Sequence, residues 1–281
     1  MTTDAAALAP RLLFLGTGAA DWPWTNPPKP LPAAPGAWRR STMTLIDDAI
    51  LLDAGPSLPD AMATYAIDAG RITDLLFTHT HSDHCDLASV AALLTSRAGQ
   101  PPLRIWSPDP LPGLALAEGC VVQRIRPWET IQCQGYAVTA LPANHHVAHE
   151  AQGSGTPVHY LFEGQGSRWL YALDGAWMRC EVRSHLEQRA LDALVIDATI
   201  GDIPDDYRVF EHNSLAMISL MTASLRRAGI LRPHAPVILD HLARTLHGSQ
   251  ADIEALVADQ GWTVAHDGLR LTLTGDDGSA S

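Results

Sequence analysis

The chain has 281 residues, 46% of them hydrophobic, and a formal net charge of -12. This length supports one large core over residues 1–281 without disulfides, and the acidic balance disfavours nucleic acid as a partner, because phosphates require clustered Lys and Arg. The segment near Met1 does not have the basic start and following apolar run of an export signal. No later stretch approaches the roughly 20 apolar residues of a membrane span, so we expect a cytoplasmic protein.

The first element predicted is a strand over residues 12–15, closed by the turn Gly16-Thr17-Gly18. Residues 19–40 then contain six prolines and three tryptophans, which excludes a regular helix or a central strand. Long irregular loops in compact domains are often lids or binding loops. Trp22 and Trp24 are therefore candidate substrate contacts, and the alternative is a surface coil that its tryptophans anchor.

Regular elements follow this loop. Residues 42–46 and 50–53 predict a hairpin, residues 59–70 a helix ended by glycine, and residues 75–77 a strand. Apolar positions on one stripe predict a helix over residues 83–97. The segment between this strand and this helix is rich in histidine.

The second half continues the alternation of strands and helices. Apolar runs bounded by Gly, Pro or Asp predict strands over residues 137–141, 159–162, 169–173, 194–196 and 237–239. Helices are predicted over residues 177–190, 214–228 and 249–260. Strands interleaved with helices throughout indicate an α/β layered domain. Leu52-Asp53-Ala54-Gly55 and Leu173-Asp174-Gly175 repeat a pattern at two strand ends, which suggests two related halves.

The segment His79-Thr80-His81-Ser82-Asp83-His84 has the spacing of a metal site. In an extended segment residues two apart point to one side, so His79 and His81 can converge on one ion, while Asp83 and His84 face a neighbouring volume. Cations would offset the cost of gathering these groups, and two cations roughly 3.5 to 4 Å apart would suit them. The alternative is a chance cluster of surface histidines.

More candidate ligands follow other strands. Asp174 and His241 each come just after an apolar run, and either His145 or His146 follows the run at 137–141. Open α/β sheets place their sites at the carboxyl ends of strands. We therefore expect these side chains to gather with the first motif at one sheet edge.

The chain resembles the metallo-β-lactamase superfamily through the motif at 79–84, Asn144-His145, Leu173-Asp174-Gly175 and Asp240-His241. This resemblance implies a four-layer αββα sandwich with two divalent metal ions, zinc or manganese. His79, His81 and His145 would hold one ion, Asp83, His84 and His241 the other, and Asp174 would bridge them around a nucleophilic hydroxide. The family motif places the histidine right after Asn, which favours His145 as the ligand and leaves His146 to line the pocket.

Further motifs are similar to the phosphodiesterase branch of this superfamily, which includes the phosphoribosyl cyclic phosphodiesterases of the C-P lyase pathway and, more distantly, RNase Z. They include Phe14-Leu15-Gly16-Thr17-Gly18, Ile196-Asp197-Ala198-Thr199 and Glu211-His212-Asn213-Ser214. The resemblance implies that His212 assists phosphoryl chemistry, although it could also be a solvent-exposed neighbour of a helix cap. Arg39 and Arg40 could clamp a phosphate, and ordinary ion pairs are the alternative.

The predicted function is hydrolysis of a small anionic phosphodiester, cyclic ones included, with Asp83 and His212 as catalytic residues and a homodimer as the expected assembly. One alternative keeps the metals but acts on a lactone, a β-lactam or another acyl compound, with Trp22 and Trp24 packing on the substrate. A second alternative is a noncatalytic module that binds a metal or a partner. The complete ligand set argues against the second.

Overall fold

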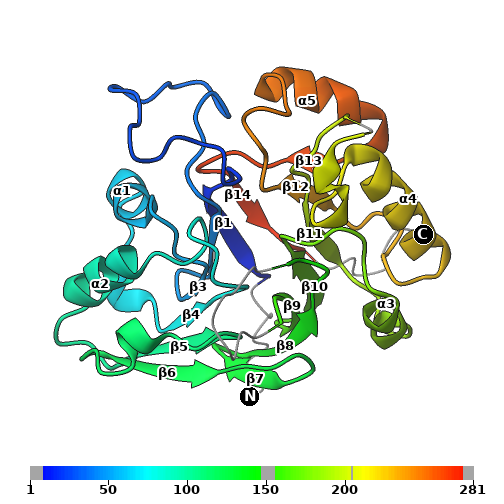
Figure 1. Ribbon diagram of the computed structural model, residues 1–281. Coiled ribbons are helices and arrows are strands. Elements are labelled where there is room, and N and C mark those ends of the chain that lie inside the picture. Colours follow the sequence, from blue (N-terminus) through cyan, green and yellow to red (C-terminus); the bar gives the residue numbers. More distant parts are fainter. Residues whose placement is uncertain (1–8, 147–155, 204, 275–281) are drawn as a thin grey trace, which may run out of the picture.

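The computed structural model describes residues 9–146, 156–203 and 205–274. The start of the chain near Met1, where the sequence predicts no export signal, lies outside these residues. Two seven-stranded sheets face each other, and helices cover the outer face of each sheet (Figure 1). The predicted four-layer αββα sandwich is therefore confirmed. No helix in the described part of the chain is long and apolar enough to cross a membrane.

The first sheet has the strand order β14-β1-β2-β3-β4-β5-β6. Its strands are β1 (Arg11–Gly16), β2 (Met43–Ile46), β3 (Ile50–Leu52), β4 (Asp74–Leu76), β5 (Leu103–Ser107), β6 (Cys120–Arg124) and β14 (Arg270–Thr272). Pairing is antiparallel from β14 to β3 and parallel from β3 to β6. The predicted hairpin is present as β2 and β3, and its two turn residues, Asp47 and Asp48, have φ of 50° and 60°, as a type I′ turn requires.

The second sheet repeats this arrangement in the order β13-β12-β11-β10-β9-β8-β7. Its strands are β7 (Thr130–Cys133), β8 (Tyr136–Pro142), β9 (Val158–Gly164), β10 (Ser167–Ala172), β11 (Ala193–Asp197), β12 (Val237–Asp240) and β13 (Thr263–Val264). Pairing changes from antiparallel to parallel at β10, as it does at β3 in the first sheet. The repeated strand-end motifs at Asp53 and Asp174 follow β3 and β10, so they occupy corresponding places in the two sheets.

Helices α1 (Leu58–Thr64) and α2 (Leu87–Ser96) pack on the first sheet, and α3 (Cys180–Leu186), α4 (Leu215–Arg227) and α5 (Gln250–Val257) pack on the second. Short 3-10 helices are η1 (Ala69–Arg71), η2 (Pro112–Leu114), η3 (Tyr207–Phe210) and η4 (Ala258–Gln260). Ser214 and Ser249 cap α4 and α5 through their side chains, which explains why these two predicted helices start where the sequence indicated.

Three predicted helices are shorter than expected. The helix predicted over 59–70 ends at Thr64, and Ala66 has a φ of 51° that no right-handed helix contains. The helix predicted over 177–190 starts late because Trp177 has a φ of 52°. The helix predicted over 83–97 starts only at Leu87, because the segment before it is held in irregular form by backbone hydrogen bonds to Ala54.

The carboxyl ends of the central strands bring the candidate ligands to one edge of the sandwich. Asp197 and Asp240 are paired at the ends of the parallel strands β11 and β12, so His241 follows directly at that edge. Asp174 follows β10, which is the next parallel strand. The predicted gathering of side chains at one sheet edge is thus a consequence of parallel pairing.

Candidate metal centre

The loop between β4 and α2 carries the histidine-rich motif and is fixed by Asp53. This buried carboxylate accepts hydrogen bonds from the backbone N–H of Thr78 at 2.8 Å and from the Thr78 hydroxyl at 2.9 Å. It also lies 2.8 Å from Nδ1 of His84. Because Nδ1 is occupied by Asp53, His84 presents Nε2 to the site.

His79, His81 and His145 form the first group of possible metal ligands. Nε2 of His79 lies 3.0 Å from Nδ1 of His81, which lies 3.1 Å from Nε2 of His145. Nitrogens bound to one tetrahedral zinc ion at about 2.0 to 2.1 Å lie roughly 3.3 Å from one another. The spacing of the three imidazole nitrogens therefore fits a single shared cation.

Asp83, His84 and His241 form a second group with similar spacing. Nε2 of His84 lies 3.2 Å from Nε2 of His241, and Oδ2 of Asp83 lies 3.4 Å from each of these nitrogens. All three side chains are buried. A carboxylate and two imidazoles at this distance, with little access to water, again fit one cation.

Asp174 lies between the two groups. Its Oδ2 is 2.5 Å from Nε2 of His84, 3.4 Å from Nε2 of His241 and 3.9 Å from Nε2 of His79. This oxygen is buried, and among the described residues no partner meets it with good hydrogen-bond geometry. An orphaned buried carboxylate oxygen between two ligand groups is suited to bridge two cations.

The electrostatics of the cluster suit metal binding. Burial lowers the pKa of His79 well below its ordinary value, and the positive potential of His84 lowers it further, which leaves a neutral imidazole with a free lone pair. Burial alone would raise the pKa of Asp83, but attraction to His84 and hydrogen bonding outweigh it, so this pKa lies well below the ordinary value. A neutral imidazole and an ionised carboxylate are the forms that bind a cation, so His79 and Asp83 are in the required state. Burial alone would lower the pKa of His84, but attraction to Asp174 and Asp83 outweighs it and raises this pKa, so a cation at the second group would replace the proton of His84.

His212 stands beside the two groups and is oriented by Asp197. Its Nδ1 lies 2.8 Å from Oδ2 of Asp197, and the same carboxylate oxygen lies 3.5 Å from Nδ1 of His241. Burial opposes the charged form of His212, but attraction to Asp197 outweighs it and raises the pKa of His212. Asp174, Asp197, His212 and His241 also lie close enough to form a further candidate ligand group.

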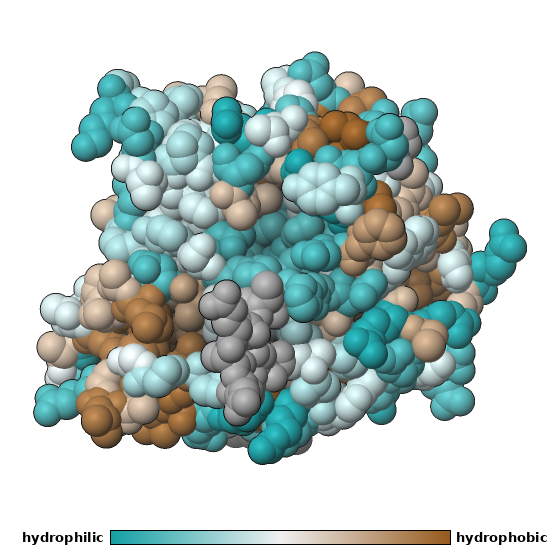
Figure 2. Space-filling model, in the orientation of Figure 1, coloured by the Kyte–Doolittle hydropathy of each residue, from teal (hydrophilic) through white to brown (hydrophobic). Residues whose placement is uncertain are grey.

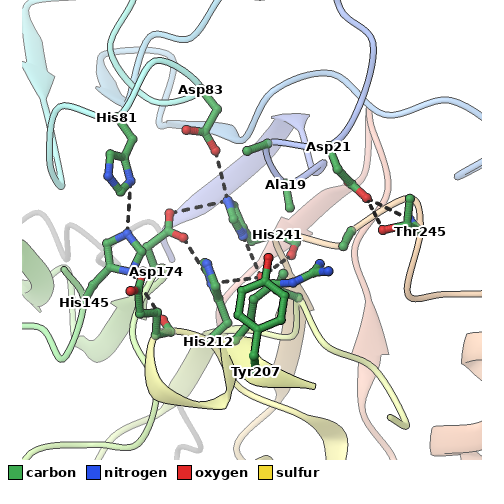
Figure 3. Close-up of a pocket in the computed structure, with 15 residues that line it drawn as sticks. Ala19, Asp21, His81, Asp83, His145, Asp174, Tyr207, His212, His241 and Thr245 are labelled. Atoms are coloured by element: carbon green, nitrogen blue, oxygen red, sulfur yellow. Dashed lines mark hydrogen bonds and ion pairs between the residues drawn. The ribbon is translucent and has the colours of Figure 1, made fainter. Parts of the chain in front are cut away.

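A cavity of about 410 Å³ opens over these side chains (Figure 3). Its lining combines members of both ligand groups with Asp174, His212 and residues from the loop after β1, from η3 and from the loop after β12. The ligands on the lining are His81, Asp83, His145 and His241. The hollow at the centre of the face in Figure 2 is hydrophilic, as expected for a site built from acids and histidines. Three residues of this region, Asp53, Tyr207 and Arg208, were not predicted from the sequence to have a role in the site.

Arg39 and Arg40 do not line this cavity, which corrects the prediction that they clamp a phosphate there. Both are buried, with 2% and 4% of their surface exposed. Arg39 donates to the hydroxyl of Thr17 and to the carbonyl of Ala265, each at 2.7 Å. Arg40 pairs with Asp60 at 2.6 Å and with the buried Asp267 at 3.4 Å. Their guanidinium groups hold the loop over 19–40 against the rest of the domain.

Trp22 and Trp24 do not line the metal cavity either, so the prediction of substrate contacts there is corrected in favour of the anchored coil. The indole of Trp22 donates to the carbonyl of Leu242 at 2.9 Å, and that of Trp24 donates to the carbonyl of Arg39 at 3.2 Å. Residues 19–40 contain no helix or strand, as predicted. His146 is exposed and joins neither ligand group, whereas His145 is in the first.

Comparison with known proteins identifies one matching sequence family and several solved structures with the same fold. The family model described as "Beta-lactamase superfamily domain" matches residues 48–232. Comparison with curated protein sequences gives no significant match.

Solved structures share the fold at low sequence identity. The metallo-beta-lactamase fold protein YhfI from Bacillus subtilis is 15% identical, with a TM-score of 0.67 over 93% of this chain and 99% of that one. A diphosphatase from the PhnP family is 17% identical, with a TM-score of 0.66 over 95% and 98%. Zn(2+)-bound PqqB from Methylobacterium extorquens is 21% identical, with a TM-score of 0.66 over 94% and 100%.

We predict that His145→Ala lowers the metal content of the purified protein by about one ion per chain, because the first group loses one of three nitrogens. His146→Ala should keep the wild-type metal content, since this side chain is exposed and belongs to neither group. Elemental analysis after dialysis against dilute zinc or manganese measures both. Equal metal loss in the two variants would contradict the assignment of His145.

We predict that Arg40→Ala lowers the free energy of unfolding by about 3 to 5 kcal/mol, because it removes the ion-pair partner of Asp267, whose side chain is 8% exposed. Arg71→Ala is the matched control, since Arg71 makes an exposed ion pair with Asp48, and its expected loss is about 0 to 1 kcal/mol. Urea denaturation of the two variants measures both losses. Equal small losses would show that Arg40 is not a structural residue.

Proposed function

Because the chain belongs to the beta-lactamase superfamily, whose domain model matches residues 48–232, we propose that it is a metal-dependent hydrolase of small phosphodiesters. The observation that carries the proposal is the position of His212 beside two complete ligand groups. A metal site alone is common to many hydrolases. An additional histidine with a fixed tautomer at its edge suits a reaction whose leaving oxygen needs a proton.

In this proposal His79, His81 and His145 would hold the first ion. Asp83, His84 and His241 would hold the second, and Asp174 would contribute to both sites. The spacing of the donor atoms and the unsatisfied Oδ2 of Asp174 support this assignment. When bound, two divalent cations would polarise the phosphoryl group and lower the pKa of water at the site. Zinc and manganese both accept imidazole and carboxylate ligands.

The protein's own part in the reaction falls to His212 and Asp197. Asp197 accepts a hydrogen bond from Nδ1–H of His212, so Nε2 of His212 faces the cavity. The proton on Nε2 is the one that the leaving oxygen takes up. The carboxylate of Asp197 also stabilises the charged imidazole before that transfer. Asp83 serves only as a metal ligand in the proposed reaction. His212 is therefore the only residue that donates a proton in it.

Relatives with the same fold support the choice of phosphodiesters. A diphosphatase from the PhnP family, human tRNase Z and yeast PDE1 align with 94 to 95% of this chain, at TM-scores of 0.66, 0.60 and 0.67. The alternative of an acyl substrate loses its main support, because Trp22 and Trp24 contact the protein rather than the cavity. The noncatalytic alternative is disfavoured by the intact donor set.

We expect the metal-loaded protein to hydrolyse bis-p-nitrophenyl phosphate and to act at least about tenfold less efficiently on lactones and β-lactams. The reason is that the cavity offers a proton donor for an alkoxide or phenolate leaving group. Comparing kcat/KM across the three substrate classes measures the preference. Preference for an acyl substrate would refute the phosphodiester proposal and leave a metallohydrolase of the other class.

We expect His212→Ala to lower kcat by about 10²- to 10⁴-fold on a phosphodiester with an alkoxide leaving group, because a positioned general acid contributes that much. The loss should be smaller on bis-p-nitrophenyl phosphate, because p-nitrophenolate is a weak base that leaves without a proton. His234→Ala is the control, since His234 is exposed and lies outside the cavity. Elemental analysis of both variants should give the wild-type metal content. If His212→Ala loses an ion, His212 is a ligand and the general-acid role is wrong.

A further inference from the structure

One short segment of the cavity wall has no role in the proposed chemistry. The 3-10 helix η3, Tyr207–Phe210, comes just before His212, and its Tyr207 and Arg208 line the cavity above the ligand groups. Figure 3 shows Tyr207 on the same side of the cavity as His212. The segment comes from a part of the sequence that the metal site does not use.

The segment is attached directly to the site. The carbonyl of Arg208 accepts a hydrogen bond from the backbone N–H of His212 at 2.8 Å. The carbonyl of Glu211 lies 3.3 Å from Nδ1 of His145. Asp206 caps the segment by accepting from the backbone N–H of Arg208 at 2.9 Å. Tyr207 and Arg208 are therefore held at a fixed place relative to both histidines.

Arg208 supplies permanent positive charge to a cavity whose other titratable lining groups are acids, histidines and a tyrosine. It is the only Lys or Arg side chain on the lining among the described residues, and Arg39 and Arg40 are committed elsewhere. Its Nε lies 3.1 Å from Oδ1 of Asp206, an ion pair without hydrogen-bond geometry that keeps the guanidinium near this carboxylate. The other edge of such a planar fork can bind two oxygens of a phosphoryl group.

Tyr207 adds an exposed aromatic surface next to this cation. Its side chain is 77% exposed, and the guanidinium carbon of Arg208 lies 5.1 Å from its ring centroid. A ring so exposed contributes little to folding, but its face can stack on a planar group of a ligand. Phe210, on the same turn, is 79% exposed and does not line the cavity.

We propose that Tyr207 and Arg208 form the substrate-recognition element of this site and select a phosphodiester monoanion that carries a flat aromatic ester group. Arg208 binds the phosphoryl oxygens, and Tyr207 stacks on the ester group that stays on phosphorus. This inference rests on the proposed function and deepens it, because it names the part of the substrate that the metal ligands cannot distinguish.

Two substrates with one leaving group test the proposal: phenyl p-nitrophenyl phosphate and methyl p-nitrophenyl phosphate. For Tyr207→Ala we expect the ratio of kcat/KM, phenyl over methyl, to fall about 5- to 20-fold from the wild-type ratio, as loss of one stacking contact predicts. Phe210→Ala, the matched control on the same turn, should keep the wild-type ratio within about twofold. For Arg208→Gln we expect kcat/KM to fall about 10- to 100-fold for both substrates, mainly through KM, with the ratio unchanged.

Calorimetry of phenyl phosphate and methyl phosphate binding to the metal-loaded protein measures the preference for the phenyl ester without turnover. We expect tighter binding of phenyl phosphate, and loss of that preference in Tyr207→Ala but not in Phe210→Ala. An unchanged ratio and unchanged binding preference in Tyr207→Ala overturn the role of Tyr207, and unchanged KM in Arg208→Gln overturns that of Arg208. If wild type hydrolyses neither diester but cleaves acyl substrates, the proposed function fails, and the binding preference still decides the recognition element.

Discussion

Imidazoles and carboxylates are buried around Asp174, and the rest of the structure must compensate for the hydration that they lose. Each of these groups loses hydration at the sheet edge, and the loss is offset only where opposite charge or a cation is close. Asp53 meets this need from the first sheet by binding His84, and Asp197 meets it from the second by binding His212 and approaching His241. The two sheets thus supply matching carboxylates behind one shared centre.

The loop over residues 19–40 depends on a second buried network, and the two networks have separate tasks. Arg39 and Arg40 bind Ala265 and Asp267 near the end of the described chain, so the loop is fixed to the rim of the sandwich. Asp21 in the loop accepts from the backbone N–H groups of Arg244 and Thr245, just after His241. The loop therefore shapes one wall of the cavity. We assign substrate recognition to a different part of the wall, η3.

The sequence predicted those features that depend on local pattern and strand order. The β2–β3 hairpin follows from two turn residues that tolerate positive φ, and the gathering of His145, Asp174 and His241 follows from the ends of apolar strands. Short strands such as β6 and β14 escaped prediction because their burial is partial and gives no clear alternation. The homodimer, the cytoplasmic location and the identity of the metal stay predictions.

Errors arose where long-range contacts decide. Nothing local to Arg39 shows that its partner is a carbonyl more than two hundred residues later. The end of α1 before Ala66 and the start of α3 after Trp177 are set by positive φ values that neither residue type favours. Tyr207 and Arg208 were not predicted, because the short segment before His212 has no periodicity to mark it.

Anomalous X-ray scattering from crystals grown with zinc or manganese tests the central claim most directly. The account predicts two peaks roughly 3.5 to 4 Å apart on either side of Asp174. One peak should lie among His79, His81 and His145, and the other among Asp83, His84 and His241. A single peak, or a peak held by Asp197 and His212, would contradict it.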